Sequence, residues 1–391
     1  MTQLNETLRI LADLIAMPSV SCDSNRPVID YLADILRSFG ADVQVQMSPC
    51  GDKANVFATM GPLIDGGLVL SGHSDVVPVA EQVWQHEPFQ MAESDGLLYG
   101  RGTCDMKGFI ACTVAMLPKL QAMVAANALP RPIHFAFTYD EEVGCIGGQQ
   151  LANWLRETGL KPRLCIIGEP TLMKVIEGHK GVCEYTTSFK GLAGHGSAPD
   201  KGVNAVEYAV RYVSRLLELR QLLETRAPVD SVFTPPWTTI NVGSLKGGMA
   251  HNVIADHAQV EWEFRPVQNS DFALVKEEVG SYVANQLLPA MQEVFPQANI
   301  ETTVIGEVQG LELTDDNEAR DICCHLTGNP DASTVAFGTE AGLFQSLGIS
   351  TVVCGPGSIE QAHKADEFIA ISELEKCVQF LNQLIDQYSA A

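Results

Sequence analysis

The feature that most constrains the fold is an alternation of helical and strand patterns over the first 178 residues. The segment GGLVLSGH at 66–73 is a continuous apolar run that ends in polar residues, as a buried parallel strand does. Similar runs at 131–140 and 163–170 alternate with helical patterns at 107–126 and 146–158. This order predicts an α/β sheet covered by helices. The earlier segments of the same kind are helices at 3–16 and 27–39 and strands at 42–47 and 54–60.

The pattern changes near residue 181, where VCEYTTSFKG alternates apolar and polar residues. The order strand–helix–strand–strand–helix–strand that begins there predicts an α+β insert, ferredoxin-like in arrangement. After residue 310 the α/β pattern returns, with a strand at 350–357 and a terminal helix at 371–389. We therefore predict one discontinuous α/β domain with a mixed sheet, formed by 1–180 and 309–391 and interrupted by an inserted domain at 181–308.

Composition narrows the class of protein. The chain has 391 residues, 46% of them hydrophobic, and a formal net charge of −23. The apolar content excludes global disorder, and the acidity makes nucleic acid and anionic membranes poor partners. The N-terminus lacks the pattern of a signal peptide, and the apolar stretch at 109–118 is too short to span a bilayer. The 11 scattered cysteines contain no C-x-x-C pair, which predicts a reducing compartment, the cytoplasm.

Polar side chains gather where the predicted parallel strands end. Ligands bind α/β sheets beyond the carboxyl ends of strands, so these residues are expected to lie close together. Two histidines with several carboxylates and no thiolate favour zinc, cobalt or manganese over a structural cysteine-rich zinc site. The residues are His73 and Asp75, Asp105 ahead of a helix, Glu141 and Glu142, Glu169, and His363 in the loop GPGSIEQAH.

Each of these residues also has an ordinary structural explanation. A single histidine at a strand end is more often structural than a ligand, Asp75 could accept a turn hydrogen bond, and Asp105 could cap the following helix. Adjacent acids such as Glu141 and Glu142 are usually solvated, but after a buried strand they repel each other unless a cation is bound. The joint convergence, rather than any one residue, favours a metal site.

The same residues form an ordered set of motifs. HSDVVP, GRGTCDMKG, DEEVG, GEPT and AHKADEF resemble, in order and spacing, the motifs of the dinuclear zinc amidohydrolases. The resemblance runs from His73 to Asp366 and implies a zinc-peptidase-like catalytic domain that carries a lid and dimerisation domain. It also implies a homodimer that acts on a small N-acyl amino acid.

The resemblance implies a role for each residue. Two divalent ions, zinc first, with cobalt or manganese possible, would be bridged by Asp105. His73 and Glu169 would complete the ligands of one ion, and Glu142 and His363 those of the other. Asp75 would orient His73 through its second ring nitrogen. Glu141 would be the general base toward the attacking water and would then protonate the leaving amine.

The insert supplies further candidates. His195 in the loop KGLAGHGSAPDKGVNA matches a family histidine that reaches the partner subunit's site and stabilises the oxyanion. Asn252 and Arg265 match positions that bind the substrate or its carboxylate, for which a guanidinium is suited. Taken alone, His195 is more simply a turn residue, and Arg265 a surface strand residue.

The loop FGTEAG at 337–342 separates members of the family. Thr339 and Glu340 are predicted to bind substrate, because an acid near the site favours a substrate with a free ammonium. Together with EGHKG and GPGSIEQAH, this loop resembles the enzymes that hydrolyse N2-acetyl-L-ornithine to L-ornithine and acetate in arginine biosynthesis. Two alternatives stay open: a broader N-acyl-amino-acid amidohydrolase acting on acetylcitrulline or acetylmethionine, and a non-catalytic metal-binding paralogue.

Overall fold

The structure is a computed structural model that describes residues 2–390. The chain divides into two compact units, each described here by itself. Unit 1 comprises Met1–Gly178, Leu313–Thr334 and Thr339–Ala391, and unit 2 comprises His179–Glu312 and Val335–Gly338. The divisions near 178 and 312 lie within a few residues of the changes in pattern along the sequence.

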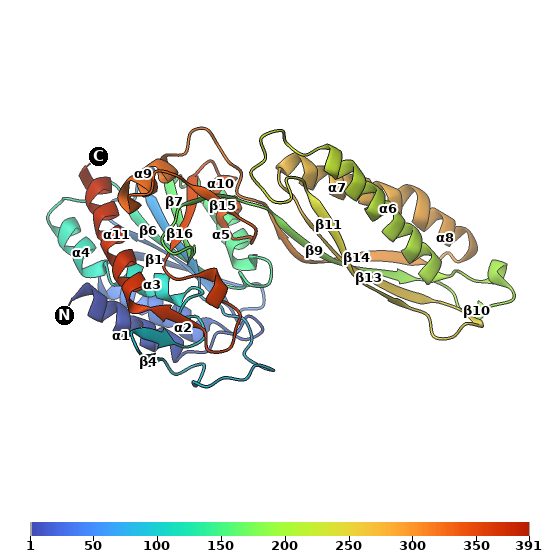
Figure 1. The fold of residues 1–391 in the computed structure, drawn as a ribbon, viewed down its shortest axis with the longest axis horizontal. Helices are drawn as coiled ribbons and strands as arrows, with labels where there is room; N and C mark the ends of the chain where they lie inside the picture. Colours follow the sequence, from blue (N-terminus) through green and yellow to red (C-terminus); the bar gives the residue numbers. More distant parts are fainter. Residues whose placement is uncertain (1, 391) are drawn as a thin grey trace. The chain divides into compact units, whose positions relative to one another are not determined.

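Unit 1 is built on one mixed sheet of eight strands (Figure 1). Its four central strands run parallel, in the order β6–β3–β7–β16. Because parallel strands point the same way, their carboxyl ends meet at one edge of the sheet. The strands in spatial order are β1 (Asp42–Met47), β2 (Ala54–Met60), β6 (Ile133–Thr138), β3 (Leu68–His73), β7 (Leu164–Pro170), β16 (Ser350–Gly355), β8 (Ile176–His179) and β15 (Ser333–Val335).

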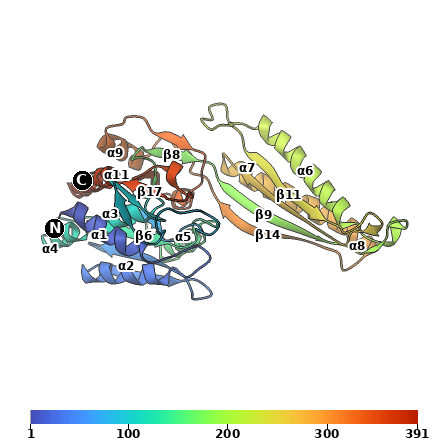
Figure 2. The ribbon, with the colours of Figure 1, turned by 60° about the horizontal axis from the view of Figure 1, so that its bottom comes forward.

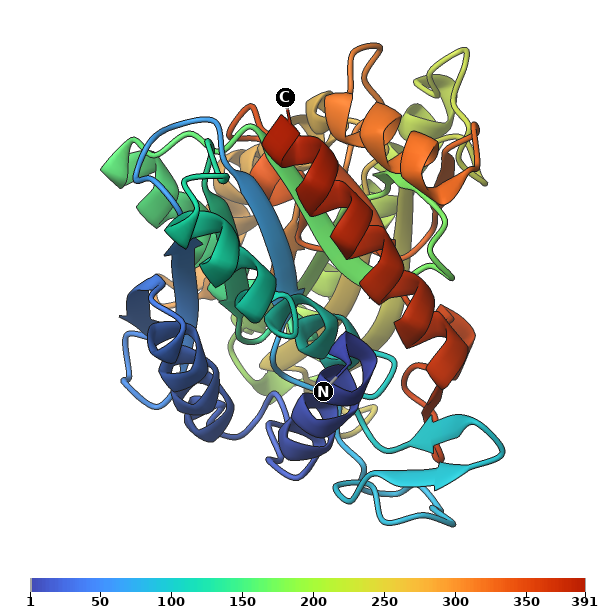
Figure 3. The ribbon, with the colours of Figure 1, turned by 90° about the vertical axis from the view of Figure 1, so that its left-hand side faces the viewer.

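The apolar runs of the sequence become the strands that are buried on both faces. Every residue of β2, β3, β6 and β7 is buried. Helices cover one face, which Figure 3 views: α1 (Gln3–Ile15), α2 (Arg26–Ser38), α3 (Lys107–Val114), α4 (Leu117–Ala125), α9 (Glu318–Thr327) and α11 (Ile371–Ala390). The packing is close enough that a Cβ at Gly168 in β7 would lie 1.9 Å from the Phe109 ring of α3. The other face carries α5 (Ile146–Thr158) and α10 (Ala341–Gln345).

A small antiparallel sheet joins two distant parts of unit 1. Its order is β17 (Phe368–Ala370), β5 (Leu97–Tyr99) and β4 (Ala92–Ser94). Phe368 pairs with Tyr99 and Ala370 with Leu97. The segment that follows His363 therefore runs beside the segment that leads to Asp105.

Unit 2 is a four-stranded antiparallel sheet with helices on one face, most easily followed in Figure 2. In β9 and β13 alternate residues are buried, as expected of a sheet with one covered face. The chain order β-α-β-β-α-β is ferredoxin-like, and the predicted fold class, a helix-covered mixed sheet with an α+β insert, is confirmed. The elements are β9 (Val182–Lys190), α6 (Ala205–Thr225), β11 (Thr239–Gly247), β13 (His257–Arg265), α7 (Asn269–Tyr282), α8 (Leu288–Val294) and β14 (Asn299–Val308), with a ribbon of β10 (Gly194–His195) and β12 (Val253–Ile254).

Two predicted helices are interrupted in the structure. The pattern at 107–126 forms α3 and α4, with a break before Pro118, which supplies no backbone N–H. The pattern at 270–292 forms α7 and α8, joined by a π-helical turn at Val283–Leu287. Lys107–Ala125 is apolar and long enough, by length and composition alone, to cross a membrane, but most of it is buried inside the structure.

Candidate metal centre

The four central strands bring the predicted metal ligands to one edge of the unit 1 sheet. His73 is the last residue of β3, and Glu169 is the penultimate residue of β7. Glu142 lies in the loop after β6, and His363 in the loop after β16. Asp105 stands just before α3. Five segments that are distant in sequence therefore each supply one side chain.

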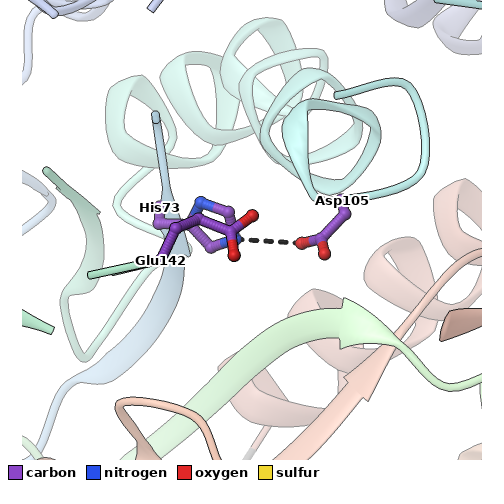
Figure 4. Close-up of side chains that lie close together, drawn as sticks. All are labelled: His73, Asp105 and Glu142. Atoms are coloured by element: carbon purple, nitrogen blue, oxygen red, sulfur yellow. Dashed lines mark hydrogen bonds and ion pairs between the residues drawn. The ribbon is translucent and has the colours of Figure 1, made fainter. Parts of the chain in front are cut away.

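The two histidines approach one carboxylate from different sides. His73 Nε2 lies 3.0 Å from Asp105 Oδ1 and 3.7 Å from Glu169 Oε1. His363 Nε2 lies 3.5 Å from Asp105 Oδ2 and 3.0 Å from Glu142 Oε2. Figure 4 shows the Asp105 carboxylate facing the His73 ring, with Glu142 beside it. Asp105 thus has one oxygen toward each histidine, the arrangement that a bridging ligand requires.

Glu141 belongs to the same cluster. Donor atoms of His73, Glu141 and Glu169 lie within 4.8 Å of one another, as do those of His73, Asp105 and Glu142. The Cys145 thiol, 3.4 Å away, donates to Glu141 Oε1. The structure therefore brings together all five predicted ligands and the predicted general base.

The donor set fits divalent cations. Oε1 of Glu142 and Oε1 of Glu169 are buried and have no hydrogen-bond partner within the part of the chain that the structure describes. Burial, and after it the nearby charge of Asp105, raises the pKa of the Glu142 and Glu169 carboxyls. Burial also raises the pKa of Glu141 to about 8. Hydrogen bonds that the His363 ring donates to Asp105 and Glu142 raise the pKa of His363 to about 10. Positive ions at this point would satisfy the two free oxygens and offset the crowded negative charge.

Asp75 approaches the second ring nitrogen of His73, the one it is predicted to orient, with both its backbone carbonyl and its carboxylate. The His73 Nδ1–H donates to the backbone carbonyl of Asp75 at 2.9 Å, while the Asp75 carboxylate is 3.6 Å away. This bond still assigns the proton to Nδ1 and leaves Nε2 free to bind a metal. The Asp75 carboxylate also accepts from the Ser21 hydroxyl at 2.7 Å and from the Glu141 N–H at 3.1 Å. It therefore positions the loop that carries Glu141, the predicted general base.

A buried ion pair anchors the same loop. Lys53 Nζ lies 2.6 and 2.8 Å from the two oxygens of Asp140, the residue before Glu141. The side chains are 12% and 10% exposed, so little solvent screens the pair. Lys53 also donates to the backbone carbonyl of Ser21. The loop after β6 is thus fixed by charge on one side and by Asp75 on the other.

The prediction that Glu340 binds substrate does not fit its surroundings, because both of its carboxylate oxygens are engaged inside unit 1. Glu340 is 1% exposed, and its oxygens accept from Ser71 at 2.5 Å and Thr138 at 2.9 Å. Thr339 is fully buried, and its hydroxyl accepts from the Ala341 N–H. Both residues therefore secure the start of α10 against the sheet, because hydroxyl partners from β3 and β6 hold the carboxylate there.

The remaining predicted residues lie in unit 2. His195 and Asn252 are brought together by the small ribbon, where His195 pairs with Val253. The exposed His195 ring bonds through Nδ1 to the Ser197 hydroxyl at 2.8 Å, which leaves Nε2 directed elsewhere. Arg265, at the end of β13, is 3.0 Å from Glu263. The ribbon thus presents a histidine whose Nε2 is available to a ligand.

Sequence reasoning missed the residues that support the site. Ser21, Lys53 and Arg101 contact the loops of the predicted ligands but lie outside the strand-end pattern. Arg101 stands inside the motif GRGTCDMKG, four residues before Asp105, and that position was the available signal.

Comparison with known proteins identifies the family. The model of peptidase family M20/M25/M40 matches residues 69–387. This chain belongs to that family. The acetylornithine deacetylases of Photorhabdus laumondii and Proteus mirabilis are each 34% identical to it, over 97% and 98% of this chain and 97% of each relative. The M20 metallo-carboxypeptidase Sso-CP2 of Sulfolobus solfataricus shares its fold, with a TM-score of 0.74 at 19% identity over 99% of this chain and all of that one.

The M20 match extends over the whole candidate site in unit 1. Its range, 69–387, contains all five candidate ligands, from His73 to His363, and Glu141. It also spans unit 2, so the inserted unit is part of the matched family architecture. Membership in this family of peptidases agrees with amide hydrolysis at the cluster.

Proposed function

We propose that this protein hydrolyses N2-acetyl-L-ornithine to L-ornithine and acetate, as a metal-dependent amide hydrolase of arginine biosynthesis. The observation that carries the chemistry is the cluster of two histidines and four carboxylates at the end of the parallel sheet. The substrate assignment is supported by relatives named acetylornithine deacetylase that align over 97% of this chain.

We assign two divalent ions, most simply zinc, to this cluster. Asp105 would bridge them, with His73 and Glu169 on one ion and Glu142 and His363 on the other. The free buried oxygens of Glu142 and Glu169 support this division, because each belongs to a different half of the cluster. When bound, such ions polarise the amide carbonyl and lower the pKa of water.

We assign proton transfer to Glu141. Its carboxylate lies in the cluster but is not needed as a ligand, so it can accept a proton from the attacking water and return it to the leaving amine. Its raised pKa, about 8, favours holding that proton until the amine departs. Positive charge at the site would lower this pKa toward neutrality, where a group that both accepts and donates a proton works best.

We propose that unit 2 completes the site in a homodimer. His195 Nε2 would donate to the oxyanion, and Asn252 and Arg265 would bind the substrate and its carboxylate. The exposed ring of His195, held at Nδ1 by Ser197, is consistent with donation to a ligand outside its own unit. We place the protein in the cytoplasm, since all eleven cysteines lie among the described residues and are free thiols.

A substrate panel tests the proposal. The zinc-loaded protein is assayed on acetylornithine, acetylcitrulline, acetylmethionine and succinyl-diaminopimelate, and we expect the highest kcat/KM on acetylornithine. Equal rates on acetylmethionine and succinyl-diaminopimelate would indicate a broader amidohydrolase. No turnover on any substrate with two zinc ions bound would indicate a metal-binding protein without this activity.

A further inference from the structure

One buried carboxylate outside the candidate ligand set is saturated with hydrogen bonds. Glu367 is 1% exposed, and its Oε1 accepts from the N–H groups of Cys104 at 2.9 Å and Asp105 at 3.0 Å. Its Oε2 accepts from the Gly102 N–H at 3.0 Å and the Arg101 guanidinium at 2.8 Å. A single side chain therefore holds four donors from the segment that ends at Asp105.

The backbone of Glu367 holds the same segment. Its carbonyl accepts from the Gly100 N–H at 2.9 Å, and the next residues form β17, which pairs with β5. The segment before Asp105 is thus fixed by main-chain and side-chain bonds from one short stretch, 367–370. Because the backbone of Asp105 is held in place, the Asp105 carboxylate can adopt few positions.

The other side of this network reaches His363. The Arg101 guanidinium, also 1% exposed, donates to the Lys364 carbonyl at 3.2 Å and to Gln82 Oε1 at 2.7 Å. The Gln82 amide donates to the His363 carbonyl at 2.9 Å. The indole of Trp84 stacks on the guanidinium at 5.0 Å, which restricts it further.

We propose that Gln82, Arg101 and Glu367, here called the Glu367 cluster, position Asp105 and His363 for metal binding. This inference rests on the proposed metal-dependent function. The cluster touches the backbone of both residues and none of their ligand atoms, so its members are positioning residues. It holds the two ligand segments in place before the metal arrives, so that little conformational entropy is lost on binding.

The chemistry of position 367 requires a carboxylate. In Glu367→Gln an NH₂ group would replace one of the two acceptor oxygens. In one orientation of the amide it would face the Arg101 guanidinium and the Gly102 N–H, and in the other the N–H groups of Cys104 and Asp105. A donor would then meet donors in either orientation. The positive charge of Arg101 would also lose its buried partner. The isosteric change is therefore expected to loosen the Asp105 segment without changing any ligand.

The test is calorimetric titration of the metal-free protein with zinc. We expect Glu367→Gln to weaken zinc binding about 10–100-fold, the usual effect of removing a group that orients a ligand. The matched control is Asp271→Asn in unit 2, another carboxylate with 1% exposure that accepts from an arginine, Arg226 at 2.9 Å, and from Thr238. The control should lower the unfolding temperature of the metal-free protein and keep wild-type zinc affinity.

A second variant covers the case in which Glu367→Gln does not fold. Gln82 is only partly buried, so Gln82→Ala should fold while releasing the His363 carbonyl, and its zinc affinity should fall several-fold. If Glu367→Gln folds and binds zinc as tightly as the wild type, the inference is overturned. If Glu367→Gln does not fold, wild-type zinc affinity in Gln82→Ala overturns it. Failure of the wild-type protein to bind zinc would instead contradict the proposed function.

Discussion

Glu141 and Glu142 are adjacent in sequence but reach different halves of the metal centre. Glu142 Oε2 lies 3.0 Å from His363, whereas Glu141 groups with His73 and Glu169. Neighbouring residues on an irregular loop can point in different directions, so one carboxylate can bind metal while the other moves protons. This arrangement supports the proposed division of roles between Glu141 and Glu142.

The variant Glu141→Ala should abolish turnover and keep both metal ions. Loss of general acid–base catalysis typically lowers kcat by about 10²–10⁴-fold, and the five ligands remain. Steady-state kinetics on acetylornithine and elemental analysis of the purified variant measure the two effects. Glu142→Gln is the matched variant and should lose metal. If Glu141→Ala loses an ion, the roles of the two glutamates are exchanged.

A second prediction concerns His134, a buried residue of β6 outside the site. Its Nδ1 bonds to the Thr59 hydroxyl at 2.9 Å, and burial lowers its pKa to about 4. The unfolded chain takes up this proton near pH 6.5, so it binds more protons than the folded state between pH 6.5 and 4. Stability from this group is present above pH 6.5 and is lost as the pH falls toward 4, by up to about 3 kcal/mol.

Urea unfolding of the metal-free protein at a series of pH values measures this effect. His134→Gln removes the titrating group, so its free energy of unfolding should fall less steeply between pH 6.5 and 4 than that of the wild type. Identical slopes for the two proteins would assign the acid sensitivity to other groups.

At the scale of elements, the loop after β6 is held by the charge of Lys53, the residue before β2. Asp140 has a positive φ of 52°, a conformation that asparagine also tolerates, so Asp140→Asn removes the charge with little backbone strain. Lys53→Met removes the other partner and leaves a nearly buried carboxylate unpaired.

Lys53→Met should lower the free energy of unfolding by about 3 kcal/mol, the cost of breaking a buried ion pair. The double variant with Asp140→Asn should lose less than the sum of the single variants, because the unpaired charge is gone. Chemical denaturation of all four proteins measures the coupling. If the loss in the double variant equals the sum of the two single losses, Lys53 and Asp140 do not stabilise the protein through each other.

The sequence predicted the long elements well and the short ones poorly. Strands 42–47 and 54–60 have the predicted bounds, because a continuous or alternating pattern of six or seven residues is distinctive. The three-residue strands β4, β5, β15 and β17 carry too few residues to show a period. The breaks inside 107–126 and 270–292 were missed because apolar spacing continues across them.

The candidate site was also predicted only in part, because some of its contacts join residues that are far apart in the sequence. The convergence of the candidate ligands was predictable because parallel strands end together, which a sequence pattern can indicate. The burial of Glu340 was not predictable, since its hydroxyl partners Ser71 and Thr138 are separated from it by 269 and 202 residues. The same holds for Glu367, whose four donors lie more than 250 positions earlier in the chain.

At the scale of the whole molecule, the proposed role of His195 requires a homodimer. We expect a homodimer by analytical ultracentrifugation, and His195→Ala should lose most of its kcat while remaining dimeric. A monomeric wild type, or a variant with near-normal kcat, would contradict the proposed role in the oxyanion site.

Mixed dimers test which subunit supplies the histidine. A dimer of one His195→Ala subunit and one Glu141→Ala subunit has one intact site if His195 acts on the partner, and none if it acts on its own subunit. Random exchange of subunits between the two inactive proteins should therefore restore about a quarter of wild-type activity. No recovery after verified exchange would place His195 in its own subunit's site.

The order of the strands also has a consequence for biosynthesis. β16 and His363 lie near the end of the chain, yet β16 is the parallel neighbour of β7, and His363 faces Asp105 and Glu142. At about 5–20 residues per second, tens of seconds pass on the ribosome between emergence of His73 and of His363. Unit 2, which is almost contiguous in sequence, can fold during this interval. A nascent chain therefore carries an incomplete candidate metal centre until His363 has emerged from the ribosome.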